Sequence, residues 1–526
     1  MEPPDNPALS KESGVGSDEE QQTPLAQFDL DKLGRQRPEV FKSALSEIFF
    51  CFSLLASMLM VEFFVSGFNI ILPTVSTTLN IPEAARTWPS SVFSLVTGSF
   101  LLPVGRLADM HGGYRLFVSG LVWFLIWSLI AGFSQNYQML IVTRALAGLG
   151  PAAYLPASTM LLGKTYRPGP RKNLIFGLYG AFAPLGFFFG IIIAGVAAEF
   201  MTWRWYFFLG AIVLALVCAT SYFAIPRDQG EDRHPDVKMD YLGVATIVPG
   251  LLLLVFAITD GAHAPNGWGT SYIIVTFIAG ILFLVAAVYV EGWVASQPLL
   301  PFAIFKPKYM CRLIVALFFA YGTFGIALLY ASFYIEDVMG VSPILTAVWF
   351  SPMAAGGIVL ATVGGFTLHL IPGSILLIIS GLGSLMTMLL FAFMPAESSP
   401  KAFWAFVFPA MLGATIGVDI PYNISNIWIT THCRRRHQGV AGGVINSLIF
   451  LGISFFLGLA DLAVAENRHK GLKESYRVAF WFGTACAGVS LLLFCTIKIG
   501  KAESELLIEE REEMGITESA DNVAAR

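Results

Sequence analysis

Two acidic residues stand inside long apolar stretches of the chain. Asp419 belongs to the run V-D-I-P-Y-N-I-S-N, and Glu62 belongs to the first apolar stretch. A charge inside a bilayer is costly, so an acid in such a place is expected to have a purpose. Because burial disfavours the charged form of a carboxyl group, either residue could bind a proton and release it when its access to water changes. These two residues therefore predict reversible protonation.

Two amides follow Asp419 at helical spacing. Asn423 and Asn426 lie four and seven residues later, which places the three side chains on one face of a helix. Pro421 removes one backbone donor from that helix and so leaves a carbonyl group for a cavity to use. We expect Asp419, Asn423, Asn426 and Glu62 to contribute to a polar cavity. The alternative is that they are polar packing residues, hydrogen-bonded to their neighbours.

The composition indicates that lipid surrounds most of this chain. Of its 526 residues, 56% are hydrophobic and 13% are charged, and the mean hydropathy is +0.68. Soluble domains carry about 25% charged residues. Lipid restricts spanning segments to helices, because these satisfy their own backbone hydrogen bonds. The predicted fold class is therefore an all-α membrane protein.

Several other classes of protein are disfavoured. The chain has no basic domain that could neutralise phosphates, so no nucleic-acid partner is expected. Its six cysteines are scattered and lack metal-ligand spacing, so neither a metal nor a cofactor is expected. The patterns H-E-x-x-H and G-x-S-x-G and a phosphate-binding loop are all missing from the sequence, which argues against an enzyme.

A membrane span needs about 20 apolar residues, and fourteen stretches of this sequence meet that need. The helices are expected at residues 47–75, 88–105, 115–134, 138–162, 173–198, 203–225, 240–261, 271–291, 311–335, 343–369, 372–394, 401–430, 439–463 and 475–498. Four further acids fall near the ends of these helices and are expected at the membrane interface: Glu291, Glu336, Asp337 and Asp461.

The basic residues orient the helices. Lys and Arg gather in the loops of one side, and the loops of the other side are nearly free of them up to residue 400. The positive-inside rule then places both termini in the cytoplasm, with a disordered tail at 1–45 and an acidic tail at 499–526. One loop on the side counted as outer disagrees, since it carries Arg468, Lys470, Lys473 and Arg477. Either late charges are tolerated, which we favour, or one helix is miscounted.

Parts of the sequence repeat after 265 residues, or one residue more. The matches pair Ala145, Gly148 and Pro156 with Ala410, Gly413 and Pro421, and Gly177, Leu185 and Gly186 with Gly443, Leu451 and Gly452. This offset of eight helices predicts two like-oriented six-helix halves, 46–225 and 309–498, and an inserted pair within 226–308. Parallel repeats of this kind hold their site between the halves, near the midplane. The alternative is a chance alignment of Gly and Pro.

The string G-R-L-A-D-M-H-G-G-Y-R, from Gly105 to Arg115, resembles the cytoplasmic signature of the major facilitator superfamily, G-x-L-x-D-x-x-G-[RK]-[RK]. The resemblance implies a gating loop built on Gly105, Asp109, Gly112 and Arg115, which latches the two halves together at the inner side. Met110 and Gly113 depart from the usual basic residues, so Arg115 is the expected partner of the acid. The alternative is an ordinary tight turn with a capping Asp.

Two further motifs resemble those of the same family. The string R-A-L-A-G-L-G begins at Arg144 and resembles R-x-x-Q-G-x-G, which implies a role for Arg144 in proton coupling. The alternative is an arginine that reaches water at the interface. Gly186, Gly190 and Gly195 follow Pro184 and resemble the antiporter motif G-x-x-x-G-P-x-x-G-G. Small residues at this spacing let two backbones touch, either at a moving seam or in plain helix packing.

The string T-W-R-W-Y-F, at 202–207, resembles W-R-W-x-F of the fourteen-helix drug:proton antiporter family. The chain is most similar to a fungal branch of that family, related to the aminotriazole-resistance transporters. The resemblance implies a major-facilitator-type fold of fourteen transmembrane helices, six, two inserted and six. It also implies the plasma membrane as the usual location, with the vacuolar membrane as another.

We expect a secondary active transporter that exports small molecules, such as a drug, toxin or metabolite, by alternating access coupled to protons. Its partners would be the small-molecule substrate, protons and the lipid bilayer, and we expect a monomer. The closest alternative reverses the direction, with uptake or facilitated transport of a small solute such as ammonium or borate. Two alternatives from other classes are a membrane sensor that does not transport and an intramembrane enzyme.

Overall fold

The computed structural model describes residues 36–166, 170–226, 237–367, 370–432 and 435–500. Most of both expected tails lies outside these described residues. So does part of several connections, including the basic residues Arg167, Arg227, Arg233 and Arg434. The described segments form helices and connections, with no strand among them.

Fourteen helices in the described part of the chain are long and apolar enough to cross a membrane. They are α2 (Ala44–Thr78), α3 (Trp88–His111), α4 (Gly113–Gly132), α5 (Tyr137–Thr165), α6 (Pro170–Phe200), α7 (Trp203–Ala224), α8 (Tyr241–Gly261), α9 (Ser271–Tyr289), α10 (Met310–Phe333), α11 (Pro343–Thr367), α12 (Gly373–Ala392), α14 (Phe408–His432), α15 (Arg435–Glu466) and α16 (Leu472–Cys495). A short α13 (Pro400–Ala402) and a π-helical turn (Phe403–Val407) lead into α14. The predicted count is confirmed.

Polar side chains mark where several spans begin. The Ser43 hydroxyl accepts from the Ser46 backbone in a capping box before α2. The Asn136 side chain caps α5, and the Asp240 side chain caps α8. Each cap satisfies backbone donors that the first turn of a helix leaves without partners. The helix starts are thus fixed locally by the sequence.

The junction of α3 and α4 differs from the prediction. The sequence predicted a loop between 105 and 115, but α3 continues to His111 and α4 begins at Gly113. Gly112, with a φ of 93°, alone separates them. Glycine adopts this left-handed backbone at little cost, and the residues before it contain no helix breaker. The segment is therefore a one-residue break between two helices.

The pairing of helices repeats along the chain. In the first six spans, α2 packs on α6 and α7, and α5 packs on α3 and α4. In the last six, α10 packs on α15 and α16, and α14 packs on α11 and α12. These pairs correspond at an offset of eight spans. They fit the predicted arrangement of six, two inserted and six helices, while the exact residue boundaries of the halves stay a prediction.

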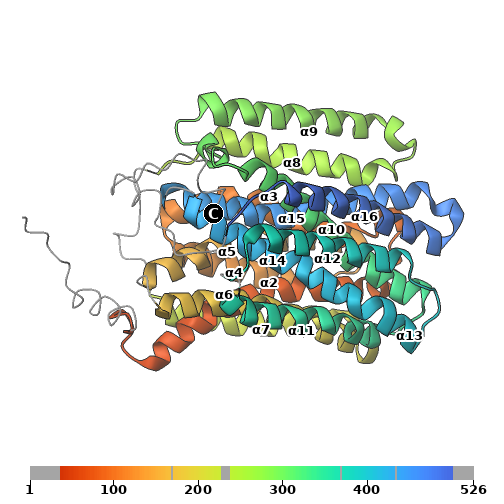
Figure 1. The fold of residues 1–526 in the computed structure, drawn as a ribbon, viewed down its shortest axis with the longest axis horizontal. Coiled ribbons are helices and arrows are strands. Elements are labelled where there is room, and N and C mark those ends of the chain that lie inside the picture. Colours follow the sequence, from red (N-terminus) through yellow and green to blue (C-terminus); the bar gives the residue numbers. More distant parts are fainter. Residues whose placement is uncertain (1–35, 167–169, 227–236, 368–369, 433–434, 501–526) are drawn as a thin grey trace, which may run out of the picture.

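The two halves meet along two seams, where α6 packs on α11 and α3 packs on α15. The inserted pair, α8 and α9, lies on one side of the bundle, and α8 packs on both α3 and α15 (Figure 1). Because the number of spans is even, both chain ends lie at the same end of the bundle. We call this the proximal end and the opposite one the distal end.

Candidate functional site

The two intramembrane acids come from different halves and lie near each other. Glu62 is near the middle of α2, and Asp419 is near the middle of α14. Each side chain is partly exposed, although it stands deep within the bundle. The charge of Asp419 acts on Glu62. The two acids thus lie within electrostatic reach of each other, while their place in one cavity and their role in coupling stay predictions.

Asp419 faces the seam between the halves. A β-carbon built on Gly357 of α11 would lie 3.0 Å from the ring of Pro184 on α6 and 3.2 Å from Oδ2 of Asp419. Three helices therefore converge at this carboxyl group: α14 and α11 from one half and α6 from the other. A carboxyl group at a seam can respond when the seam opens, because its contact with water then changes.

Tyrosines surround the two acids. Glu62 acts electrostatically on Tyr154 of α5 and on Tyr422 of α14, and Asp419 acts on Tyr321 of α10. Tyr154 and Tyr321 are fully buried. We call these five residues the central acid cluster. A phenol can donate a hydrogen bond to a carboxylate or accept one from a protonated acid, so the cluster can accommodate either state.

The two predicted amides use their donors on their own helix. Asn423 Nδ2 donates to the backbone carbonyl of Asp419 at 2.8 Å, and Asn426 Nδ2 donates to the carbonyl of Tyr422 at 2.9 Å. Both amide groups therefore use a donor within their own helix, as expected if Asn423 and Asn426 are polar packing residues. Their side-chain oxygens can still accept from a ligand, so a place in the cavity stays a prediction.

Arg144 of α5 is buried between two aromatic rings. It is 2% exposed, and its guanidinium carbon lies 3.9 Å from the ring centre of Phe68 and 4.5 Å from that of Phe93. Nε donates to the carbonyl of Pro89 at 3.0 Å, and Nη1 donates to that of Phe64 at 3.3 Å. Among the described residues no carboxylate pairs with it. An arginine that reaches water at the interface is therefore not what the structure contains.

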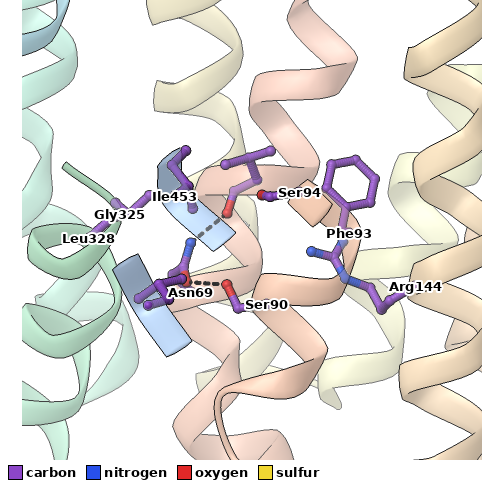
Figure 2. Close-up of a pocket in the computed structure, with 10 residues that line it drawn as sticks. Asn69, Ser90, Phe93, Ser94, Arg144, Gly325, Leu328 and Ile453 are labelled. Atoms are coloured by element: carbon purple, nitrogen blue, oxygen red, sulfur yellow. Dashed lines mark hydrogen bonds between the residues drawn. The ribbon is translucent and has the colours of Figure 1, made fainter. Parts of the chain in front are cut away.

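A small pocket opens beside Arg144, between the two halves (Figure 2). Its polar lining comes from Asn69, Ser90 and Ser94 of the first half, and Ser90 donates to Asn69 Oδ1 at 2.8 Å. Its apolar lining includes Leu328 of α10, from the second half. The room inside is on the order of one water molecule. The pocket thus places the guanidinium of Arg144 and hydrogen-bonding groups of the first half against apolar residues of the second half.

The three predicted packing glycines act at two different contacts. A β-carbon on Gly186 would meet the backbone of Leu59, and one on Gly190 would meet the backbone of Phe63, both on α2 of the same half. A β-carbon on Gly195 would lie 2.9 Å from the side chain of Ala347 on α11 of the other half. Two of these glycines thus fit plain helix packing, and the third lies at the seam.

The predicted gating residues all lie at the proximal end, around the break between α3 and α4. Gly105 of α3 faces Pro156 of α5 at an ordinary contact distance. Asp109 is in the last turns of α3, where the sequence placed it in a loop. Arg115, on α4, is exposed, and no ion pair joins it to Asp109 in the described part of the chain. The expected pairing of Arg115 with that acid is thus not seen.

The distal end holds a set of charges that the sequence reading missed. Nη2 of Arg86, in the α2–α3 connection, lies 2.7 Å from Oδ2 of Asp337, in the π-helical turn Tyr334–Val338 that follows α10. Tyr476 of α16 accepts from Arg86 at 2.9 Å and donates to Asp337 at 3.2 Å. The guanidinium carbon also lies 4.2 Å from the ring centre of Phe333. These contacts tie the first half to the second.

The basic loop that disagreed with the positive-inside rule also contributes to contacts at the distal end. Arg468, in the α15–α16 connection, forms an ion pair with Glu83 of the α2–α3 connection. Arg477 of α16 donates to the carbonyl of Met394 at 3.1 Å. The count of fourteen spans is confirmed, so these charges do not signal a missed helix. Arg468 thus links the two halves. The sequence feature that could have predicted such a contact is the acid and the base, Glu83 and Arg86, in the short α2–α3 connection.

A third distal contact joins the inserted pair to the second half. His263, in the α8–α9 connection, lies 2.7 Å from Oδ2 of Asp461 on α15, and Tyr330 of α10 donates to Oδ1 at 3.4 Å. Burial lowers the pKa of His263, but Asp461 and Asp260 outweigh it, so the pKa of His263 is raised above its ordinary value. Asp461 is 3% exposed. Asp461 is thus covered by its partners near the distal end of α15, and the interfacial position expected for it stays a prediction.

Comparison with known proteins bears on the family. Residues 54–457 match the sequence profile described as Major Facilitator Superfamily. The low affinity ammonium transporter of Saccharomyces cerevisiae is 31% identical over 501 residues, which cover 93% of each chain. The efflux pump terJ of Aspergillus terreus is 30% identical over 81% of this chain and 83% of its own. The aminotriazole resistance protein of Saccharomyces cerevisiae is 30% identical over 87% of this chain and 85% of its own.

Solved structures show the same fold. A peptide transporter crystallised with sulfate aligns with a TM-score of 0.60 and 18% identity, covering 84% of this chain and 93% of that one. At this identity the likeness shows the fold alone. The profile covers more than half of the chain and the relatives are transporters, not enzymes. The chain belongs to the major facilitator superfamily, beside fungal resistance and efflux proteins of that family.

Proposed function

We propose that this transporter exports small molecules in exchange for protons. The observation that carries the proposal is the central acid cluster, which brings Glu62 of one half within electrostatic reach of Asp419 of the other. Two carboxyl groups that act on each other across a seam favour binding of a proton, because like charges disfavour ionisation of both. A change in the seam then changes how tightly the proton is held.

The distal ion pairs give the starting state of this cycle. Arg86–Asp337 and Arg468–Glu83 close the distal end, while Glu62 and Asp419 are partly exposed. The rocking of the halves would break the distal pairs and expose the cluster to the opposite side. A ligand shifts this equilibrium only by its different affinity for the two states. A proton on the cluster and a substrate in the interface would each supply such a difference.

The names of the relatives favour export. Two of them are called an efflux pump and a resistance protein. The pocket beside Arg144 suggests the kind of group that a substrate would present, since it combines a cation with hydroxyl and amide groups. We also propose that the proximal end, which carries both termini, faces the cytoplasm, in the plasma membrane.

A second candidate is uptake or facilitated transport of a small solute. It is favoured by the relative called a low affinity ammonium transporter, which matches 93% of the chain. This fold is compatible with uptake as well as export. Protonation of the central acid cluster would then accompany inward movement of the solute, or would not be coupled to transport at all.

Transport by the full-length protein in proteoliposomes tests both candidates, with aminotriazole and ammonium as the probes. An imposed pH gradient should drive aminotriazole against its own gradient. Asp419→Asn and Glu62→Gln should each reduce the driven component by roughly ten-fold or more, a loss of about 1.4 kcal/mol. Glu474→Gln is the matched control, because Glu474 is exposed and pairs with Arg477 on its own helix. Driven transport that survives unchanged in both acid variants would refute proton coupling through this cluster. Ammonium flux that ignores the pH gradient would favour the second candidate.

A further inference from the structure

The base of the inserted helix pair contains two carboxyl groups that the transport cycle above does not use. Asp240 is the N-cap of α8, and Glu291 belongs to a π-helical turn, Val290–Val294, that ends α9. Both lie at the proximal end. Glu291 is 6% exposed, so the protein covers it, and the interfacial position that the sequence suggested stays a prediction.

Each of these carboxyl groups satisfies one oxygen and leaves the other unpaired. Asp240 Oδ1 accepts from the Gly243 backbone at 2.8 Å, and Glu291 Oε2 accepts from the Leu300 backbone at 2.8 Å. Asp240 Oδ2 and Glu291 Oε1 are both buried and have no hydrogen-bond partner among the described residues. A buried oxygen without a partner is costly, so the pattern calls for a donor.

The two unpaired oxygens point at the same place. A β-carbon built on Gly243 would approach both of them more closely than 3.0 Å. As two carboxylates they repel each other and neither can donate, whereas one proton lets one group donate to the other. A metal ion would need more oxygen ligands than this pair supplies, and no group of three or more metal-binding side chains occurs in the described part of the chain.

This pair stands beside a contact between the inserted helices and the gating segment. Arg106 of α3 donates to Gln297 Oε1 at 2.8 Å and to the carbonyl of Lys238 at 3.3 Å. The Lys238 backbone also donates to Gln297 Oε1, at 2.9 Å. Lys238 lies two residues before Asp240, and Gln297 lies six residues after Glu291. The positions of both segments therefore determine whether Arg106 can form these two hydrogen bonds.

We propose that Asp240 and Glu291 bind one proton between them, and that this shared proton holds the base of the inserted pair, and with it the Gln297 contact to Arg106, in place. The proton comes from solvent at the proximal end and bridges the two oxygens. Its loss leaves two buried negative charges in contact, which separates the ends of α8 and α9. The ionisable group that acts on Glu291 is Asp240, and Arg106 contacts the same base from α3.

The proposal is tested on the full-length protein in lipid nanodiscs, without any transport substrate, so its result is independent of the proposed function. Infrared spectroscopy with exchange into D2O detects the carbonyl band of a protonated carboxyl group. Glu291→Gln and Asp240→Asn keep the backbone hydrogen bonds but remove the shared proton. The difference spectrum of each variant against the wild type should therefore show the loss of one carbonyl component, while any band from the central acid cluster stays. Gly243→Ala should alter that component by forcing the oxygens apart. Glu474→Gln, the exposed control, should leave it unchanged.

Hydrogen exchange of the amides of residues 105–111 tests the contact with Arg106. The protection of these amides is compared between the wild type and Glu291→Gln at each pH. In the wild type the amides should lose protection as rising pH removes the shared proton. The variant should stay protected throughout. A carbonyl region that is the same in the wild type and in both acid variants overturns the shared proton. A bound cation is tested by measuring the unfolding temperature in K⁺ or Na⁺ and in choline at the same pH. If the metal ions change the unfolding temperature of the wild type but not that of Glu291→Gln, the pair binds a cation and the shared proton is overturned. Identical exchange in wild type and variant overturns the link to α3.

Discussion

Arg86 and Asp337 join the two halves across the distal end, with 2.7 Å between Nη2 and Oδ2. The side chains are 14% and 19% exposed, so water screens this pair only in part. Arg86 precedes α3 of the first half, and Asp337 lies in the π-helical turn that follows α10 of the second half. Any movement that opens the distal end must therefore separate them.

Asp337→Asn is expected to favour opening of the distal end. The cost of removing one partner should lie between the roughly 0.5 kcal/mol of an exposed ion pair and the roughly 3 kcal/mol of a buried one. A cysteine placed at the buried Leu457 of the interface, in a cysteine-free background, should then react faster with a maleimide added from the distal side. The charge exchange of Arg86→Asp with Asp337→Arg should restore slow labelling. Labelling that is as slow in Asp337→Asn as in the parent would contradict a sealing role.

The contact of His263 with Asp461 should depend on pH. Because the pKa of His263 is raised in the fold, its charged form adds stability that is complete below the ordinary histidine pKa. That stability is lost as pH rises through the raised value. Hydrogen exchange of residues 262–270 should therefore quicken, beyond the intrinsic effect, over that window. His263→Gln should remove the dependence, and His469→Gln should keep it. A dependence shared equally by wild type and His263→Gln would exclude this histidine.

Two glycines of α6 should respond in opposite ways to the same change. A β-carbon on Gly190 would lie 2.6 Å from the carbonyl oxygen of Phe63, whereas one on Gly180 meets nothing within 4 Å. Gly190→Ala should cost about 1–3 kcal/mol through overpacking. Gly180→Ala should be neutral or gain about 0.5–1 kcal/mol, as alanine is the better helix former. Thermal unfolding in one detergent compares them. Equal midpoints would mean that α6 does not rest on α2 as described.

Arg144 should matter more for transport than for stability. Its guanidinium is buried, and no carboxylate pairs with it among the described residues, so an apolar replacement removes the cost of keeping a charge out of water. Arg144→Met should therefore unfold at the same temperature or higher, but transport less. Arg144→Lys should also transport less, since an ammonium cannot lie flat between Phe68 and Phe93 while bonding both carbonyls. Full transport by Arg144→Met would exclude a role for this charge.

Hydropathy was enough to predict the number of spans and most of their ends. The exception at α3 has a clear cause: only Gly112 breaks the helix, whereas the signature motif suggested a longer loop. The repeat predicted a site between the halves, but it did not predict that Glu62 and Asp419 would act on each other.

Partners that are distant in the chain were not predictable. Arg86 lies 390 residues from Tyr476, and nothing in a single sequence joins them. Asp240 and Glu291 each resembled an ordinary residue at a helix end, and nothing in the sequence indicated that the two would meet. Spacing along one helix is visible in a sequence, but contacts between helices need the packed structure.

The carbonyls that hold Arg144 have a consequence for biogenesis. Phe64 belongs to α2 and Pro89 to α3, and ribosomes release both segments before α5. An arginine that enters lipid alone costs about 2.5–3.5 kcal/mol on translocon scales. Chain order thus supplies its acceptors and aromatic neighbours in advance, so α5 can leave the translocon against a surface already prepared for it.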